Sequence, residues 1–237
     1  MARDDSADRI LQKVRIGCPL VLLDDRKERE GDLFCAAAAA APEVLQFMVR
    51  RGSGLLCLAL PRERLEEIGI PRITEGLTNL GYVVAAMNLE AAPEQVKCYW
   101  VPWVKFFTSF ATRGMADTPF HFPVDLAAQH SGISVVERLE TIQALLKPEA
   151  TIDWFTTPGH LFTLGAHAQG MQGRWGHTEA SVVLCRAAGL LCEIVGDDGN
   201  MLRGADLETF AAATNVEILP VSAIPGLLSR QAALTPG

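Results

Sequence analysis

The sequence lacks several features that would define its class at once. It has no run of about 20 consecutive apolar residues, which excludes a membrane-spanning helix. Its six cysteines include no Cys-x-x-Cys pair, which argues against a zinc ribbon or a thioredoxin-like site. It has no long basic run, and its net charge of −7 argues against binding nucleic acid through phosphate contacts. The first residues lack the apolar stretch of a signal peptide, so we expect a cytoplasmic protein with reduced cysteines.

What the sequence does contain predicts one folded domain over residues 1–237. Hydrophobic residues make up 49% of the chain and charged residues 21%, which excludes a disordered protein and allows a sizeable core. Helical and strand patterns alternate without a regular repeating unit, so we expect an α+β fold in which helices flank a mixed β-sheet. Predicted helices follow Ser6 and Pro42 and cover residues 62–68, 135–146, 178–188 and 206–213; predicted strands cover 19–23, 55–60, 190–195 and 216–221; turns are expected at 156–159 and 197–200.

An acidic segment, residues 24–32, follows the first predicted strand. It carries five carboxylates and three cations within nine residues. Such a run is most often a loop that faces water. Two observations favour a function instead: the segment begins where an apolar strand ends, and its Gly31-Asp32 pair leads directly into another apolar run. Clustered carboxylates of this kind suit a hard divalent cation such as Mg²⁺.

A second segment, residues 174–179, leads from a glycine-containing loop into a predicted helix. The backbone N–H groups at a helix start attract anions, and Arg174 and the Thr178 hydroxyl would add donors for a phosphate. His177 could be a metal ligand or a general base. The alternative is an ordinary helix start that Thr178 caps, with His177 exposed to solvent.

Three single residues are weaker candidates for a functional role. His160 follows a Pro-Gly turn, where a histidine is more often structural than catalytic. Glu193 lies within an apolar predicted strand, where a carboxylate is costly unless it is paired or bound; the alternative is a position at the exposed edge of the strand. Cys57 lies in another apolar strand, where a buried and unreactive thiol is the simpler interpretation.

Taken in order along the chain, these segments resemble the 3,4-dihydroxy-2-butanone 4-phosphate synthase family of riboflavin biosynthesis. Residues 26–32 stand in the place of the family's Asp-Arg-Glu-Asn-Glu-Gly-Asp. Residues 174–180 match its Arg-x-Gly-His-Thr-Glu-Ala completely. Three further motifs of the family are similar to residues 51–57, 157–164 and 192–201.

The resemblance implies a three-layer fold and a lyase that converts ribulose 5-phosphate to 3,4-dihydroxy-2-butanone 4-phosphate and formate. It also implies Mg²⁺ or Mn²⁺ as the cofactor, and a homodimer with its sites at the subunit interface. Glu28 and His177 would hold the metal ion, and Arg174 and Thr178 would hold the phosphate. By the same resemblance, catalysis would fall to Glu30, Asp32, Cys57, His160 and Glu193, and substrate binding to Lys27, Glu28, Asp32, Arg174, Gly176, His177, Thr178 and Glu193.

The resemblance is incomplete around these shared residues. An aromatic-rich insertion, at about residues 83–118, lies where the family has a short stretch. Three hypotheses stay open: the family's own reaction, the same metal–enediol chemistry on a different sugar phosphate or hydroxylated substrate, and a non-catalytic relative that acts as an interaction module. The chain differs from the family's motifs at Lys27, Arg29, His130, Ser131 and Thr157.

Overall fold

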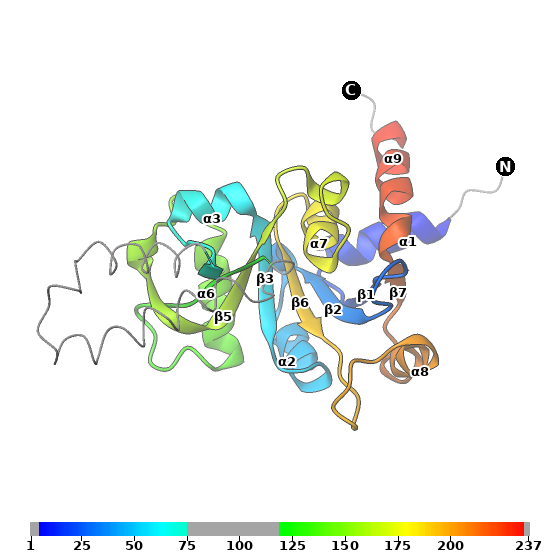
Figure 1. The fold of residues 1–237 in the computed structure, drawn as a ribbon, viewed down its shortest axis with the longest axis horizontal. Helices are drawn as coiled ribbons and strands as arrows, with labels where there is room; N and C mark the ends of the chain where they lie inside the picture. Colours follow the sequence, from blue (N-terminus) through cyan, green and yellow to red (C-terminus); the bar gives the residue numbers. More distant parts are fainter. Residues whose placement is uncertain (1–4, 75–118, 235–237) are drawn as a thin grey trace, which may run out of the picture.

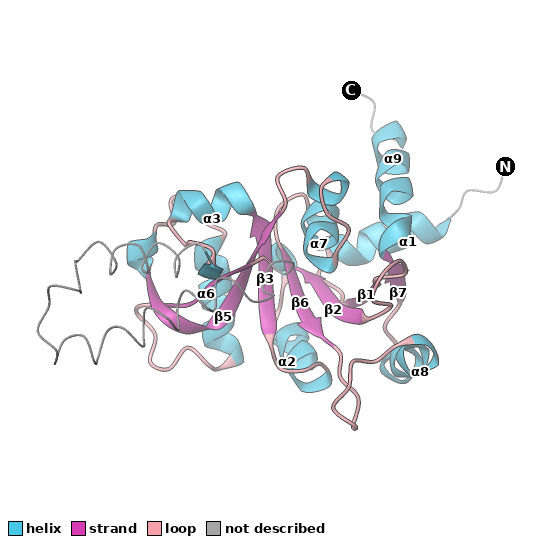
Figure 2. Ribbon diagram, in the orientation of Figure 1, coloured by secondary structure: helices cyan, strands magenta, loops and turns pink. Residues whose placement is uncertain are grey.

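A seven-stranded mixed β-sheet runs through the part of the chain that the computed structural model describes, residues 5–74 and 119–234 (Figure 2). The strand order is β4-β5-β3-β6-β2-β1-β7. β1 pairs with β7, and β3 with β5, in parallel, whereas the other neighbours pair antiparallel. The mixed sheet confirms the α+β prediction. The strands are β1 (Leu20–Leu23), β2 (Gly31–Ala36), β3 (Leu56–Pro61), β4 (Phe120–Leu126), β5 (Phe155–Ala166), β6 (Gly189–Glu193) and β7 (Ile218–Pro220).

Both faces of this sheet are covered, because its central strands divide their apolar side chains between two cores. In β2, Leu33 and Cys35 belong to one core, and Phe34 and Ala36 belong to the other. All four side chains are buried. Successive side chains of a strand point to opposite faces, so a strand that is apolar throughout needs a layer of helices on each side.

Helices of the described chain form the two outer layers (Figure 1). Helices α1, α7 and α9 contribute to the core that contains Phe34, and α2, α3, α6 and α8 contribute to the core that contains Leu33. This arrangement agrees with the predicted three-layer fold. The helices are α1 (Asp5–Arg15), α2 (Pro42–Arg51), α3 (Arg62–Ile68), α6 (Val135–Leu145), α7 (His177–Cys185), α8 (Gly204–Thr214) and α9 (Ile224–Leu234).

Local sequence signals set the ends of several helices. The prediction of a helix over residues 62–68 is confirmed by α3, which ends where Gly69 adopts a left-handed conformation with φ of +94°. The helix predicted over 178–188 begins one residue earlier, as α7, and ends at Cys185. It stops there because Arg186 adopts the left-handed conformation, which an ordinary helix cannot continue through.

The turn predicted at residues 156–159 is wrong, because strand β5 runs through it. β5 pairs with β4 there, with shifts in register between the two strands. Gly159 lies so close to β4 that an added Cβ would come within 2.1 Å of the carbonyl carbon of Val124. The glycine therefore permits a close approach of two strands, where the local sequence predicts a reversal of the chain. Strands β2, β4 and β5 and helix α9 have no counterpart among the predicted strands and helices.

The aromatic-rich insertion predicted at about residues 83–118 lies outside the described residues. Within the described ranges, no helix is both long and apolar enough to cross a membrane. The described strands share one sheet, and the single domain over residues 1–237 stays a prediction for the chain as a whole.

Candidate active site

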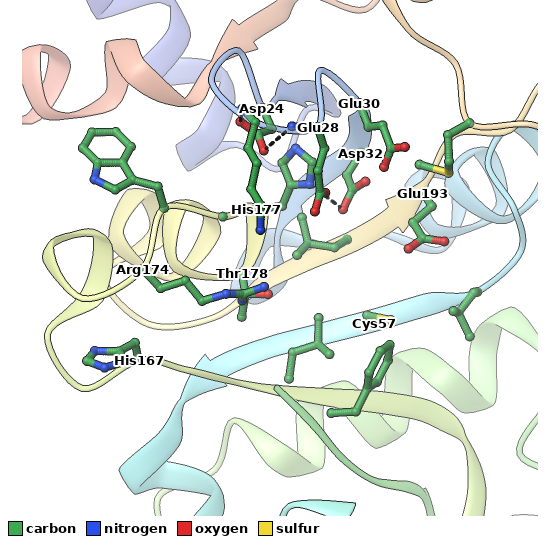
Figure 3. Close-up of a pocket in the computed structure, with 18 of the residues that line it drawn as sticks. Asp24, Glu28, Glu30, Asp32, Cys57, His167, Arg174, His177, Thr178 and Glu193 are labelled. Atoms are coloured by element: carbon green, nitrogen blue, oxygen red, sulfur yellow. Dashed lines mark hydrogen bonds and ion pairs between the residues drawn. The ribbon is translucent and has the colours of Figure 1, made fainter. Parts of the chain in front are cut away.

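A cavity of about 460 Å³ lies between the β1–β2 loop, the sheet and the start of α7 (Figure 3). It brings together two segments that are far apart in the sequence, residues 24–32 and 174–178. Of the predicted site residues, His160 does not line this cavity. The others do, and they are Lys27, Glu28, Glu30, Asp32, Cys57, Arg174, Gly176, His177, Thr178 and Glu193.

Asp24 gives the acidic loop between β1 and β2 its shape. Its buried carboxylate accepts hydrogen bonds from the backbone N–H groups of Arg26, Lys27 and Glu28, at 2.9, 3.0 and 3.2 Å. Burial on its own would raise the pKa of Asp24, but the three backbone bonds and the charge of His177 lower it below its usual value. The loop is therefore a preformed turn, and it directs Lys27 and Glu28 to the cavity.

Polar residues share the face of the sheet that forms the cavity floor. Asp32 in β2 is the direct partner of Glu193 in β6. Cys57 in β3 is the partner of Leu191, which points to the same face as Glu193 because the two are two residues apart. Partial burial raises the pKa of Glu193, and the negative charges of Asp32 and Glu30 raise it further. Glu193 therefore holds a proton more readily than an exposed glutamate does.

The Cys57 thiol is a neutral part of this floor. Burial raises its pKa far above the usual value, and the negative charges of Asp32 and Glu193 raise it further. A thiol must ionise to act as a nucleophile, so the raised pKa disfavours a nucleophilic role for Cys57. These surroundings favour the interpretation of Cys57 as a buried, unreactive thiol, although its side chain lines the cavity.

His177 has one ring nitrogen engaged and the other without a partner. Its Nδ1 lies 3.3 Å from Oδ2 of Asp32, and its Nε2 is buried with no hydrogen-bond partner among the described residues. Burial alone would lower the pKa of His177, but the charge and hydrogen bond of Asp32, and then the charges of Asp24 and Glu28, raise it. The side chain is 13% exposed, so the interpretation of an exposed histidine is wrong. An imidazole that a carboxylate holds through Nδ1 presents Nε2 to a metal ion or a substrate.

The start of α7 forms another wall of the cavity. Gly176 is the N-cap residue, and no side chain caps the helix. The expected cap by Thr178 is therefore wrong; its side chain is buried and lines the cavity instead. The first backbone N–H groups of an uncapped helix, together with the helix dipole, attract an anion.

Arg174 is held beside this helix start by a buried carboxylate. Its Nη1 lies 3.3 Å from Oε2 of Glu179, which is fully buried, and Oε1 of Glu179 accepts a hydrogen bond from the His167 backbone N–H at 3.1 Å. Gly176 has a φ of −162°, which any residue can adopt. An added Cβ there would nevertheless lie 3.2 Å from Oε2 of Glu179 and 3.5 Å from the guanidinium carbon of Arg174. Glycine at this position therefore leaves room for the ion pair.

Glu30 forms an ion pair with Arg203, and a backbone bridge joins the same two residues. Arg203 also donates a hydrogen bond to the carbonyl oxygen of Glu28 at 3.3 Å. These contacts attach the acidic loop to the segment just before α8. A carboxylate paired in this way contributes charge and loop geometry to the cavity, and the pairing argues against Glu30 as a proton-transferring base.

His160 lies on β5, away from the cavity. Its Nδ1 is 2.6 Å from Oδ2 of Asp125, and its backbone N–H donates to Oδ1 of the same carboxylate at 2.8 Å. The His160 side chain is 44% exposed. Within one chain, the structure does not bring His160 to the other predicted site residues, because Asp125 on the edge strand β4 holds the ring outside the cavity.

Several cavity residues have no predicted role. The sequence does contain a signal for the turn at Asp24. An aspartate often accepts hydrogen bonds from the backbone N–H groups that follow it, and Asp24 binds three of them. No local motif marks the buried Glu179 as the partner of Arg174, because their contact depends on how the loop folds back on α7. The other cavity residues without a predicted role are Leu55, Phe120, Leu164, His167, Gly173, Trp175, Leu191 and Met201.

Comparisons with known proteins agree on one family. A family model described as 3,4-dihydroxy-2-butanone 4-phosphate synthase matches residues 8–225. A 3,4-dihydroxy-2-butanone 4-phosphate synthase of Bordetella pertussis is 32% identical over 232 residues, which cover 95% of this chain and 86% of the relative. The crystal structure of this synthase from Candida albicans has a TM-score of 0.70 at 26% identity, covering 93% of this chain and 96% of that chain. Another synthase structure, in complex with two magnesium ions, has a TM-score of 0.68 at 28% identity, with coverage of 94% and 96%.

Proposed function

The chain belongs to the 3,4-dihydroxy-2-butanone 4-phosphate synthase family, and we propose that its cavity converts D-ribulose 5-phosphate to 3,4-dihydroxy-2-butanone 4-phosphate and formate, for riboflavin biosynthesis. Members of this family are enzymes, lyases that release formate. One observation carries the proposal for this chain. Nε2 of His177 is buried with no partner among the described residues, and the side chain lines a cavity that also contains Glu28 and an uncapped helix start.

The reaction defines what the cavity must do. The two products together contain all the atoms of ribulose 5-phosphate, so the conversion needs no oxidant or reductant. It needs protons to be moved between neighbouring carbons and oxygens, negative charge on substrate oxygens to be stabilised, and the sugar phosphate to be held in one orientation.

The side chains fit a divalent metal ion. We propose that Glu28 and His177 hold Mg²⁺, because a carboxylate oxygen is a ligand that Mg²⁺ prefers and Nε2 of His177 has no other partner in the described part of the chain. Asp32 would orient the ligand through Nδ1. The described residues contain no group of three or more His, Cys, Asp or Glu side chains that could hold a metal ion, so water and substrate oxygens would complete the coordination. When bound, the cation supplies Lewis-acid stabilisation of negative charge on adjacent substrate oxygens.

Proton transfer would fall to the carboxylates on the cavity floor. Glu193 has a raised pKa, so it can receive a proton from the substrate and return it at a later step. Its neighbour Asp32 would bind a substrate hydroxyl while it orients His177. The neutral Cys57 thiol would close the floor against water.

The phosphate would bind at the start of α7. The backbone N–H groups of the helix, the Thr178 hydroxyl and the Arg174 guanidinium are donors from one wall of the cavity. Lys27, on the acidic loop, adds a positive charge to the same cavity. A phosphate held there fixes the orientation of the sugar without taking part in the bonds that break.

We further propose a homodimer in which His160 completes the cavity of the partner subunit. His160 is exposed, and Asp125 orients its ring. The neighbouring surface is apolar, with Ile133 52% exposed and Val136 57% exposed. Gly132 packs so closely on Asp125 that an added Cβ would lie 2.2 Å from Oδ2, so this apolar surface and the histidine form one region. A second copy of the chain would bury it.

We also propose that Mn²⁺ can replace Mg²⁺, and that the enzyme works in the cytoplasm. The oxygen and imidazole donors of the proposed site accept either ion. The five cysteines in the described ranges are free thiols, which is consistent with a reducing compartment.

A second candidate reaction is the same chemistry on a different sugar phosphate. It is favoured by the differences from the family's motifs at Lys27 and Arg29, which lie beside the proposed metal ligand. Lys27 cannot make the two-pronged contact of an arginine, so a substrate hydroxyl or phosphate would be held differently.

Formate release tests both candidates. Purified protein with Mg²⁺ and ribulose 5-phosphate is expected to form one formate for each sugar phosphate consumed, and a Glu28→Gln variant is the matched control. A parallel series uses other phosphorylated pentoses and tetroses. If ribulose 5-phosphate stays unconsumed while another sugar phosphate is turned over, the second candidate replaces the first.

A further inference from the structure

Arg26 and Trp175 form a cation–π contact beside the cavity. The guanidinium of Arg26 lies over the indole ring of Trp175, 3.7 Å from the ring centroid. This distance is well inside the range of about 6 Å for a cation–π contact. Both side chains are exposed, and neither belongs to the two hydrophobic cores. The contact, called the rim contact below, is therefore not required for packing of the fold.

The rim contact joins the two segments that supply the proposed site. Arg26 belongs to the acidic loop, two residues before Glu28. Trp175 stands between Arg174 and Gly176, the N-cap of α7. Glu28, which would bind the metal ion, and Arg174, which would bind the phosphate, thus lie within two residues of the two ends of the rim contact.

Most other contacts at the site hold each of these two segments separately. Asp24 holds the acidic loop through the backbone, and Glu179 holds Arg174. The pair formed by His177 and Asp32 connects the two segments in the interior. The rim contact connects them at the surface, so it is placed to control the spacing across the opening of the cavity.

The family resemblance does not supply this contact. The family motif has aspartate at the position of Arg26, and it leaves the position of Trp175 unspecified. An aspartate would be repelled by the negative face of an indole ring, whereas an arginine stacks on it. The rim contact is thus a property of this chain's own sequence.

We propose that the rim contact sets the spacing between Glu28 and Arg174, and so favours a ligand that reaches both segments at once, such as a sugar phosphate with hydroxyls at one end and phosphate at the other. This proposal rests on the proposed function. Arg26 and Trp175 are positioning residues, because they act through their neighbours. A ligand that contacts only one segment gains nothing from a fixed spacing, and inorganic phosphate at the start of α7 is the example.

Steady-state kinetics test the proposal. Arg26→Ala and Trp175→Ala are each expected to raise KM for ribulose 5-phosphate about two- to fivefold, the loss that corresponds to one exposed cation–π contact, with a smaller change in kcat. The double variant is expected to match the single variants, because the same contact is lost in all three. Arg26→Lys and Trp175→Phe keep a cation or a ring and are expected to restore part of the loss. Calorimetry is expected to show an unchanged affinity for inorganic phosphate.

Lys147→Ala is the matched control. It removes the other cation–π contact within the described ranges, between Lys147 and Trp154 at 5.8 Å, and neither residue lines the cavity. Its KM is expected to equal that of the parent. The proposal is overturned if the effects of Arg26→Ala and Trp175→Ala multiply in the double variant. It is also overturned if the phosphate affinity weakens in parallel with KM, as general loosening of the fold would produce.

Amide hydrogen exchange separates this proposal from the proposed function. Trp175→Ala is expected to speed exchange in a peptide that covers residues 24–30, and Arg26→Ala in one that covers 173–178, while Lys147→Ala changes neither. If the parent forms no formate from ribulose 5-phosphate, the proposed function fails and hydrogen exchange alone decides whether the rim contact couples the segments. Unchanged exchange in both peptides overturns the proposal.

Discussion

His177, at the start of α7, and His160, on β5, are both held by an aspartate through Nδ1. Oδ2 of Asp32 lies 3.3 Å from the first ring, and Oδ2 of Asp125 lies 2.6 Å from the second. The two regions differ in what surrounds the rest of the ring. The His177 side chain is 13% exposed and its buried Nε2 has no partner within the described ranges, whereas the His160 side chain is 44% exposed.

This difference separates two uses of the same local arrangement. A carboxylate at Nδ1 fixes the orientation of an imidazole and leaves Nε2 to act elsewhere. In the His177 region that nitrogen belongs to a side chain that lines a cavity of the same chain, where we propose that it holds the metal ion. In the His160 region the ring faces out of the chain, which supports the proposal that it serves the cavity of a second copy.

The largest expected effect comes from the enclosed region. His177→Ala and Glu28→Gln are each expected to lower formate release by at least about 10²–10³-fold, because each removes a group that would hold the stabilising cation. Calorimetry with Mn²⁺ is expected to show binding to the parent and none to His177→Ala. His160→Ala is the matched control and is expected to bind Mn²⁺ as the parent does. Unchanged Mn²⁺ affinity in His177→Ala would remove this residue from the metal site.

The outward-facing region is tested by a mixed dimer. His160→Ala alone is expected to lower formate release by about 10²-fold or more, as for loss of a proton-transferring group. A heterodimer of one His160→Ala chain and one Glu28→Ala chain, isolated through two different tags, is expected to regain about half of the parent activity. One of its two shared sites keeps both side chains. A heterodimer as inactive as either homodimer would place both residues in sites built from a single chain.

An intermediate effect is expected from the carboxylate behind the phosphate site. Glu179→Gln keeps the shape of the side chain but removes the charge that holds Arg174, and it is expected to raise KM for ribulose 5-phosphate about tenfold. Gly176→Ala is expected to act in the same direction, because its Cβ would lie 3.2 Å from Oε2 of Glu179. Steady-state kinetics with ribulose 5-phosphate, and calorimetry with inorganic phosphate, measure both. A normal phosphate affinity in Glu179→Gln would show that Arg174 needs no such partner.

The smallest effect concerns the loop that covers Asp125 in the His160 region. Glu137 accepts hydrogen bonds from the backbone N–H groups of Ser131 and Ser134. These contacts lower its pKa from 4.5 to about 2, and the contact with Ser131 has the largest effect. A lowered pKa in the folded state stabilises the fold above pH 4.5, and that contribution is lost as pH falls toward 2. Glu137→Gln is expected to lower the urea midpoint at pH 7, and the gap from the parent is expected to close below pH 4.5.

Circular dichroism across pH 3 to 7 measures these midpoints. Glu149→Gln removes one exposed carboxylate away from the hydrogen bonds of Glu137, so it controls for the change in net charge. A gap between Glu137→Gln and the parent that stays constant with pH would contradict the assignment of the effect to the ionised carboxylate.

The parts of the site that could be predicted are those that a single segment builds. The acidic loop folds around its own Asp24, and the anion-attracting start of α7 depends on residues 174–178, so local patterns were sufficient for both. The pairing of Glu30 with Arg203 could not be predicted, because it depends on where the segment before α8 returns to the loop. The wrong turn at residues 156–159 has a similar cause, since a Pro-Gly pair serves equally for a turn and for the close approach of two strands.

The sequence by itself determined the class of the fold, the family and most of the side chains of the site, because alternation of apolar residues and short motifs are local properties of a chain. Only the tertiary structure decided which groups meet. Asp32 lies beside Glu193 through the register of two antiparallel strands. Packing leaves Nε2 of His177 without a partner among the described residues, and His160 is exposed on β5, next to the edge strand β4. The physical reason is that register and burial are set by contacts between segments distant in sequence, and no local pattern encodes these contacts.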